Sequence, residues 1–145
     1  MIIKKIGLKN FRNHQSLSFD FTDHLNVLTG LNAVGKTNVV EAIYYLSLGR
    51  SFRTNEDIDL IKKNHERAEI DATILEGEIT RKIKITITKT GRSVMINGKN
   101  ISKLSELSKC VNVILFQPKD VMLFSGPPRE MYNWIVDRKK LNMIM

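Results

Sequence analysis

The sequence predicts an α/β fold in which a glycine-rich loop joins a strand to a helix and an antiparallel β meander follows. Two observations support this prediction. Gly30–Thr37 lies between a short apolar run at 25–28 and a helical pattern at 37–48, and apolar residues alternate with polar ones between Ala68 and Ile96. Alternation with a period of two is typical of half-buried strands, whereas an apolar stripe at helical spacing favours a helix.

The first 66 residues contain a strand pair, the glycine loop and the helix. Alternation at 6–9 and at 17–21 predicts two strands, and the polar segment at 11–14 predicts the connection of an antiparallel pair. The apolar run at 25–28 predicts a third short strand. We expect the helix at 37–48 to end at Gly49, because glycine adopts the left-handed conformation that terminates helices.

The rest of the chain is predicted to add a meander and a return to the core. Strand patterns end at Ile74, Ile87 and Ile96, and each is followed by an X-Gly turn signal. The other expected elements are a short helix at 56–63, a helix at 103–109 capped by Ser102, a buried strand at 111–116 and a final helix from Pro127. The predicted organisation is one lobe with a P-loop part at 1–66, an antiparallel basic β meander at 67–103, and a return to the core with the final helix at 104–145.

Composition limits the classes of function. The 145 residues include 23 Lys and Arg against 15 Asp and Glu, so the formal net charge is +8 and favours a polyanionic partner. A single cysteine, Cys110, excludes a disulfide framework and a multi-cysteine zinc site, and it is expected to be a small core residue. The three histidines are expected to be isolated turn or solvent residues. No apolar run has the length of a membrane span, so we expect a cytoplasmic protein without a membrane contact.

Most of the net charge lies in the predicted meander. Residues 79–103 contain seven basic residues and no acidic one. Lys82 and Lys84 fall on the strand face opposite Ile83, where they could contact a phosphate backbone without reading sequence. A solvated strand face protected against edge pairing is the alternative. The residues proposed to contact DNA are Arg81, Lys82, Lys84, Lys89 and Arg92.

The segment Gly30–Thr37 fits the phosphate-loop pattern G-x-x-x-x-G-K-[ST]. Its glycines allow backbone N–H groups to approach a phosphate, Lys36 supplies a positive charge, and Thr37 supplies a hydroxyl for Mg²⁺. Hydrolysis also needs an acidic residue on a second strand, and the only candidate, Glu76, is better explained as a surface carboxylate. The sequence therefore predicts half of a nucleotide site and no catalytic residue.

Four segments beyond the glycine pattern resemble one family. They are Leu8–Asn13, Gly30–Ile43, Gly49–Thr54 and Val113–Asp120 followed by Gly126 and Pro128. Together they resemble the N-terminal part of the RecF family of bacterial DNA-repair ATPases, which is related to SMC-type and ABC-type heads. The resemblance implies a P-loop NTPase of ABC/SMC-head type, with a mixed sheet and an antiparallel β subdomain, in a truncated version of longer family members.

The resemblance also implies cofactors and partners. They are ATP and Mg²⁺, double-stranded and gapped or junction DNA, RecR and RecO, and an ATP-dependent homodimer of the full-length protein. The implied function is recombinational repair, replication restart and recombinase loading after DNA damage, including the SOS response. The full-length family implies a weak DNA-dependent ATPase, and this chain is expected to be inactive. The nucleotide residues are Gly30, Leu31, Asn32, Ala33, Val34, Gly35, Lys36, Thr37 and Asn38, with Arg12, Asn13 and Gln117 added by the resemblance, and with Thr37 and Gln117 as Mg²⁺ residues.

One departure and several alternatives remain. The family has an arginine cluster where this sequence reads Met131–Val136, so the role of that cluster is open here. The alternatives are another SMC- or ABC-type head, a small P-loop kinase, a transporter ATPase subunit, and a folded DNA-binding piece without a working nucleotide site.

Overall fold

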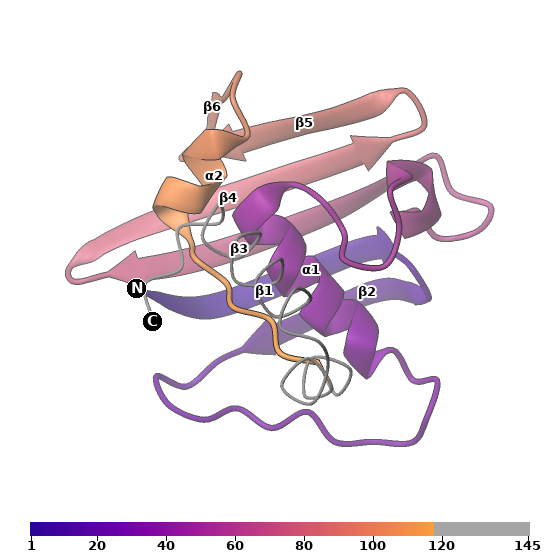
Figure 1. The fold of residues 1–145 in the computed structure, drawn as a ribbon, viewed down its shortest axis with the longest axis horizontal. Coiled ribbons are helices and arrows are strands. Elements are labelled where there is room, and N and C mark those ends of the chain that lie inside the picture. Colours follow the sequence, from indigo (N-terminus) through magenta and orange to yellow (C-terminus); the bar gives the residue numbers. More distant parts are fainter. Residues whose placement is uncertain (118–145) are drawn as a thin grey trace, which may run out of the picture. The chain divides into compact units, whose positions relative to one another are not determined.

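The computed structural model describes residues 1–117, and the chain divides into two compact units, Met1–Val111 and 112–145. The first unit is built on one six-stranded sheet with the strand order β2-β1-β3-β4-β5-β6 (Figure 1). The elements are β1 (Ile2–Phe11), β2 (His14–Asp20), α1 (Lys36–Leu48), the 3₁₀ helix η1 (Asp57–Leu60), β3 (Arg67–Glu76), β4 (Ile79–Thr88), β5 (Gly91–Ile96), β6 (Lys99–Asn100) and α2 (Ser105–Cys110).

The N-terminal hairpin and the meander form one continuous sheet because β1 pairs with both β2 and β3. In the register, Leu8 of β1 lies opposite Leu17 of β2 and Ile70 of β3, and Ile70 lies opposite Ile85 of β4. Since successive side chains of a strand point to opposite faces, this register places the apolar set of every strand on one face.

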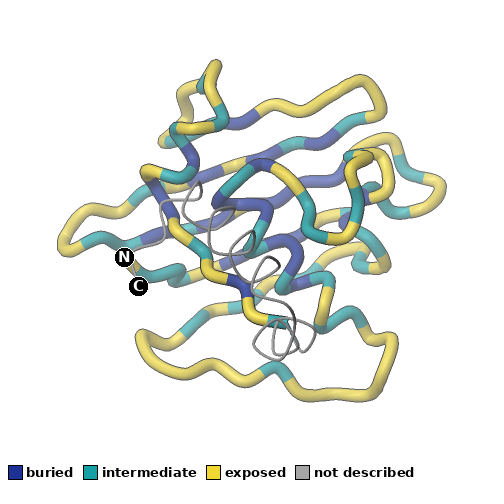
Figure 2. The backbone as a smooth tube through the Cα atoms, in the orientation of Figure 1, coloured by how far each residue is buried: buried dark blue, intermediate teal, exposed yellow. Residues whose placement is uncertain are grey.

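Helices α1 and α2 lie over one face of the sheet (Figure 1), and buried residues alternate with more exposed ones along its strands (Figure 2). The helix α1 buries Val39, Ala42, Tyr45 and Leu46 against the sheet and contacts α2. The isoleucines of β3 and β4 form the other half of the core. They are Ile70, Ile74, Ile83, Ile85 and Ile87, each at most 1% exposed.

Several sequence predictions are confirmed by the structure. The strand pair and the three meander strands lie where the alternation predicts them, and α1 begins one residue before its predicted start. Gly49 ends α1 with a φ of 63°, and its N–H donates to the carbonyl of Tyr45 at 2.7 Å. Cys110 is buried as predicted.

Other predicted elements differ. Residues 25–28 form no strand, and Leu25 and Val27 are 84% and 69% exposed, because no strand in the described part of the chain pairs with them. The helix predicted at 56–63 is only the single turn η1, because Ile61 is extended and bridges to Phe11 of β1. The segment at 25–28 is apolar but has no partner strand in the described part of the chain, and the helix at η1 is shorter than predicted.

The C-terminal predictions are only partly within the described residues. The N-cap residue of α2 is Leu104, and no side chain caps the helix, so the predicted cap by Ser102 is wrong. Residues 111–116 form no strand, and every strand pairing within residues 1–117 is antiparallel, so the mixed character expected of the sheet is not seen there. The helix predicted from Pro127 lies outside the described residues. No helix in residues 1–117 has the length and apolar character needed to cross a membrane.

Candidate phosphate-binding site

The glycine loop enters α1 through backbone conformations that favour glycine. Gly30 and Gly35 have φ values of 146° and 100°, and Ala33 has a φ of 65°. A Cβ at Gly35 would lie 2.6 Å from Oδ1 of Asn13 and would also collide with the His14 ring. Gly35 is therefore fixed by its own backbone angle and by the close approach of the β1–β2 turn.

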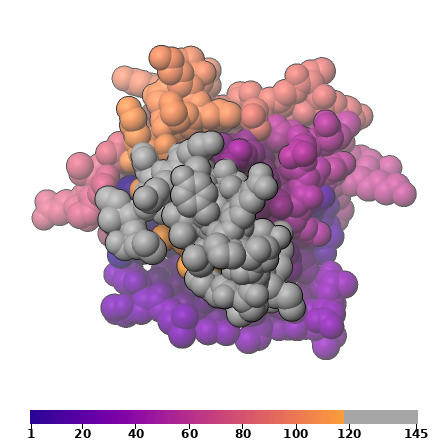
Figure 3. All heavy atoms as spheres, viewed as in Figure 1, coloured from indigo at the N-terminus to yellow at the C-terminus, as the bar shows by residue number. Residues whose placement is uncertain are grey.

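The loop is closed by hydrogen bonds to its own carbonyls. The Lys36 ammonium donates to the carbonyls of Gly30 at 2.6 Å and Leu31 at 2.7 Å, so the loop wraps around the lysine head. From the β1–β2 turn, Asn13 donates to the carbonyl of Ala33 at 3.2 Å, and His14 Nε2 lies 3.1 Å from the carbonyl oxygen of Gly35. The exposed loop at 21–35 runs along the lower margin of the view in Figure 3.

A pocket of about 350 Å³ opens between this loop and the start of α1. No side chain caps the N-terminus of α1, so its first turn offers backbone N–H groups to an anion at this end of the helix. The pocket thus combines amide groups, a hydroxyl and two cationic side chains, a donor set that suits phosphate oxygens. The lining residues are Asn13, Asn32, Ala33, Gly35, Lys36, Thr37, Asn38 and Arg53.

A buried carboxylate on α1 lies behind this pocket. Glu41 is 0% exposed and accepts two hydrogen bonds from Arg12, Nε to Oε2 at 2.9 Å and Nη2 to Oε1 at 2.7 Å. Ser51 donates to Oε1 at 2.5 Å, and Arg53 Nη1 lies 3.2 Å from Oε2. Burial opposes the charge of Glu41, but the hydrogen bonds from Arg12 and Ser51 and the charges of both arginines hold its pKa below the ordinary value.

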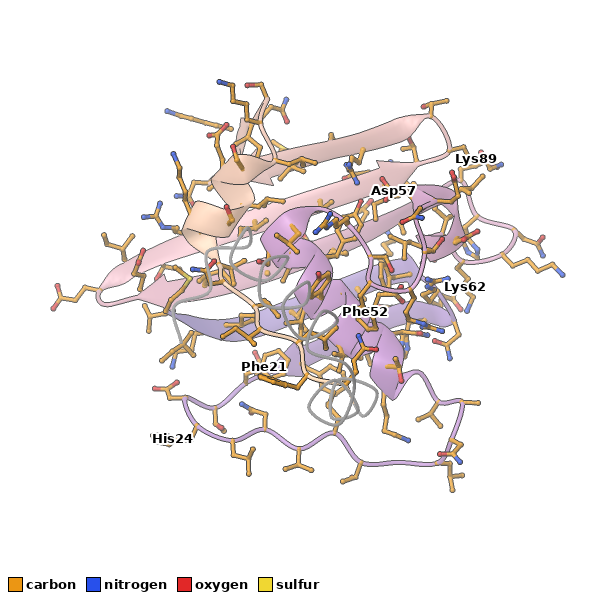
Figure 4. The ribbon with its side chains drawn as sticks, in the orientation of Figure 1. Phe21, His24, Phe52, Asp57, Lys62 and Lys89 are labelled. Atoms are coloured by element: carbon orange, nitrogen blue, oxygen red, sulfur yellow. The ribbon has the colours of Figure 1, made fainter. Side chains whose placement is uncertain are left out.

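The β1–β2 turn that carries Arg12 is tied to the segment around η1. The backbone N–H of Arg12 donates to the carbonyl of Leu60 at 2.8 Å, and its Nη1 donates to the carbonyl of Asp59 at 2.8 Å. Lys62, labelled in Figure 4, donates to the carbonyl of Asn13 at 2.9 Å. These bonds hold Arg12 and Asn13 against the start of α1.

Arg53 is a pocket residue that the sequence analysis did not assign. Its Nη1 donates to Oδ1 of Asn38 at 2.7 Å, and Asn38 donates in turn to Oδ1 of Asn13 at 2.7 Å. The neighbouring Phe52, labelled in Figure 4, packs edge-on against Tyr44 of α1 with ring centroids 5.5 Å apart. The signal was present in the Gly49–Thr54 segment, but sequence alone did not show that this segment folds back to the phosphate loop.

The structure brings most of the predicted nucleotide residues together. Asn13 and Asn38 line the pocket with the loop, whereas Arg12 lies in the β1–β2 turn, is bonded to Glu41 and is not a lining residue. Gln117 belongs to the second unit, so the structure does not place it relative to the phosphate loop. His14 lies at the β1–β2 turn, as predicted, and its ring also contacts the carbonyl of Gly35, which the sequence analysis did not predict. No group of three or more His, Cys, Asp or Glu side chains suited to a metal occurs within the described residues.

The five residues predicted to contact DNA do not share one surface. Lys82 and Lys84 are exposed on the open face of the sheet, as predicted. Arg81 and Arg92 point to the helix-covered face, because Arg81 lies opposite Ile74 and Arg92 lies opposite Ile87. Lys89 lies in the β4–β5 turn and pairs with Glu66 at 2.8 Å.

Arg92 instead links β5 to α1 and η1. It donates to the Tyr45 hydroxyl at 3.0 Å, pairs with Asp57 at 2.8 Å and donates to the carbonyl of Gly49. Figure 4 shows Asp57 near the turn that carries Lys89. Burial raises the pKa of the Tyr45 hydroxyl, which donates to Asp57 at 2.9 Å. Arg92 is therefore a structural contact between layers.

The open face has a shallow basin of about 350 Å³ lined by Lys5, Asp71, Thr73, Lys82 and Lys84 among others. Beside it, Glu69 pairs with Lys84 at 3.0 Å and with Arg67 at 3.1 Å. The hydrogen bond from Lys84 lowers the pKa of Glu69, whereas burial raises the pKa of Asp71. The segment 79–103 contains no acidic residue, but this face also carries Glu69 and Asp71 of β3, so it mixes positive and negative groups.

The phosphate loop at the start of α1, carried by this sheet, defines a class of ATPase head. Residues 2–126 match the RecF/RecN/SMC N-terminal domain, and the chain belongs to that family. The chain is similar to the DNA replication and repair protein RecF of Clostridium acetobutylicum, with 42% identity over 129 residues that make up 88% of this chain and 36% of the relative. RecF of Lactobacillus acidophilus is 40% identical over 128 residues, 88% of this chain and 34% of the relative. The chain thus spans about a third of the length of these relatives.

Solved structures agree with this assignment. The recombination mediator protein RecF of the RecFOR pathway matches in its RecF-ATPrS form with a TM-score of 0.79 and 30% identity, over 88% of this chain and 35% of that chain. Its RecF-ATP form matches with a TM-score of 0.80 and 26% identity, over 97% of this chain and 39% of that chain. An SMC head domain from Thermotoga maritima shares the fold. Its TM-score is 0.61 at 22% identity, over 75% of this chain and 41% of that chain. The predicted ABC/SMC-head fold and the resemblance to RecF are confirmed.

Proposed function

We propose that the pocket at the start of α1 binds the phosphates of ATP. The observation that carries this proposal is the closed phosphate loop, in which Lys36 is held by the carbonyls of Gly30 and Leu31 beside the first turn of α1. Asn13, Asn38 and Arg53 add donors on the opposite side of the same pocket. The related structures named RecF-ATP and RecF-ATPrS support the choice of ATP among anions.

The pocket also suits Mg²⁺ accompanying the nucleotide. The Thr37 side chain is exposed and lines the pocket, so its hydroxyl can serve as one oxygen ligand. We propose Gln117 as a second oxygen ligand, on the strength of the resemblance. Bound Mg²⁺ neutralises phosphate charge, while the residues of this chain bind and orient the phosphates.

Substitution of Lys36 tests the nucleotide proposal. Lys36→Met removes the charge while keeping an unbranched side chain, and we expect ATP binding, measured by calorimetry, to be lost. Lys63→Met is the matched control, because Lys63 is an exposed lysine outside the pocket and should leave binding unchanged. A wild-type chain that is folded and does not bind ATP would support the alternative of a folded DNA-binding piece without a nucleotide site.

We further propose that the open face of the sheet contacts the phosphate backbone of DNA through Lys82 and Lys84. Both side chains are exposed and line the same basin as Lys5. Such contacts position a duplex without reading its sequence. Arg81 and Arg92 point to the helix-covered face and Lys89 lies in the β4–β5 turn, so these three do not belong to this surface. Lys84 is on it and also pairs with Glu69.

Neutralising the two lysines tests the DNA surface. Lys82→Gln with Lys84→Gln should weaken binding to duplex DNA and reduce the slope of log affinity against log salt by about 1.8, since each phosphate contact contributes about 0.9. Lys103→Gln with Lys109→Gln removes the same charge from exposed residues at α2 and is the control. Equal losses in the two double variants would show that only net charge matters.

At the level of the full-length protein, we propose ATP-dependent dimerisation and action with RecR and RecO in recombinational repair. This includes binding of gapped or junction DNA, recombinase loading and a weak DNA-dependent ATPase activity in the cytoplasm. The support is the similarity to RecF over 88% of this chain and the RecFOR pathway of the related structures. We propose that residues 1–145 act as one lobe of such a head.

A further inference from the structure

Two arginines share one buried carboxylate, and one of them, Arg53, lines the nucleotide pocket. Glu41 is 0% exposed, Arg12 is 19% exposed, and Arg53 is 43% exposed. Arg12 occupies both carboxylate oxygens in a fork geometry, which is the strongest arrangement available to an arginine and a carboxylate. Arg12 is therefore firmly held.

The contact of Glu41 with Arg53 is longer and one-sided. A single nitrogen, Nη1, lies 3.2 Å from Oε2 of Glu41 and 2.7 Å from Oδ1 of Asn38. Arg53 also lines the pocket that contains Lys36 and Thr37. The carboxylate thus holds one nitrogen of a guanidinium that belongs to the pocket wall.

The charges in this cluster do not cancel. Two arginines against one carboxylate leave a net positive charge next to Lys36. Ser51 donates the fourth hydrogen bond to Glu41, and its hydroxyl also accepts the N–H groups of Arg53 at 2.9 Å and Thr54 at 3.3 Å. The backbone that carries Arg53 is therefore fixed to the same carboxylate as its side chain.

We propose that Glu41 is a positioning residue for nucleotide binding, which orients Arg53 at the phosphate pocket and fixes Arg12, and with it the β1–β2 turn that carries the pocket residue Asn13. This inference rests on the proposed ATP site. Glu41 itself cannot touch the phosphates, because it is buried and negatively charged. Its effect on affinity is exerted through the two arginines that it holds.

The first test compares Glu41→Gln with Glu69→Gln. Glutamine keeps the shape of the side chain and removes its charge, and Glu69 is a matched control with two basic partners away from the pocket. Calorimetry with ATP should show a loss of about tenfold or more in affinity for Glu41→Gln and a change below about twofold for Glu69→Gln. Equal affinities in wild type and a folded Glu41→Gln variant would overturn the proposal.

A double-mutant cycle separates positioning from a general structural effect. Arg53→Ala should weaken ATP binding about fivefold or more in the wild-type background and about twofold or less in the Glu41→Gln background. Independent, additive losses would contradict the proposal. If Glu41→Gln does not fold, the same comparison is made on Glu41→Gln with Arg12→Gln, which removes both charges of the buried pair.

A nucleotide-free measurement keeps this inference distinct from the ATP proposal. The Nε–H group of Arg12 donates to Glu41, so its NMR signal should be sharp and protected from exchange in wild type and lost in Glu41→Gln. If wild type binds no ATP but this signal behaves as stated, the nucleotide function fails and the ordering by Glu41 stands. An Arg12 signal that is unchanged in the variant overturns the ordering itself.

Discussion

Two glutamates in this molecule have the same chemistry and different surroundings. Glu41 on α1 and Glu69 on β3 each pair with two basic side chains, and each has a lowered pKa. The partners of Glu69 are open to solvent, with side chains 61% and 45% exposed, whereas Arg12 beside Glu41 is 19% exposed. Water can replace Glu69 as a partner of its cations, and it cannot do so for Arg12. Burial of the partners, more than the number of ion pairs, decides what each carboxylate contributes.

The largest loss of stability is expected when the buried carboxylate of Glu41 is truncated. Glu41→Ala should lower the free energy of unfolding by about 2–4 kcal/mol, because it leaves the Arg12 guanidinium, which is only 19% exposed, without its anion. Urea unfolding followed by circular dichroism measures this loss. A loss below about 1 kcal/mol would remove the distinction between the two carboxylates.

Gly35→Ala tests whether the phosphate loop requires glycine at the start of α1. The φ of 100° and the clash with Asn13 and His14 predict a loss of about 1–3 kcal/mol in the free energy of unfolding together with loss of ATP binding. Gly77→Ala is the control, because Gly77 also has a positive φ, 60°, but a Cβ there meets nothing within 4 Å. Equal effects at the two glycines would show that backbone angle alone matters.

The free energy of unfolding should depend on pH through the ionised forms of Glu41 and Glu69. A carboxyl group with a folded-state pKa below its unfolded value stabilises the fold above the unfolded pKa, and this contribution is lost as the pH falls through the folded pKa. Stability should therefore fall below about pH 4.5, with Asp71, whose pKa is raised, acting in the opposite direction. Urea midpoints at pH 7, 5, 4 and 3 measure this. The curve of a folded Glu41→Gln variant should be flatter than wild type, and an identical slope would contradict the role of Glu41.

The smallest effect is expected on the open face. Glu69→Ala should change the free energy of unfolding by about 0.2–1 kcal/mol, because Lys84 and Arg67 gain water as a partner. The change should shrink further in 0.5 M salt. A loss as large as that of Glu41→Ala would mean that burial of the partners does not explain the comparison.

Sequence patterns predicted the parts of the fold that depend on local periodicity. The alternation of β3 and β4 and the stop at Gly49 need no distant information. The segment at 25–28 was predicted to be a strand because it is apolar, but a strand also needs a hydrogen-bonded neighbour, and none occurs among the described residues. The split of the basic residues over two faces was missed for Arg81 and Arg92, although their spacing of two residues from Ile83 and Val94 already places them on the apolar face. Only the acidic side chains that meet them there, Glu76 and Asp57, were not visible in the sequence.

By itself, the sequence determined the phosphate loop, the helix that follows it and the strands of the meander, because glycine conformation and side-chain periodicity act over a few neighbouring residues. Only the tertiary structure decided that Arg12, Glu41 and Arg53 meet at one point, since they lie on β1–β2, α1 and the segment after Gly49. The sheet also decided which lysines share a surface. Long-range packing sets these distances and the solvent access of each charge, and both determine the strength of an ion pair.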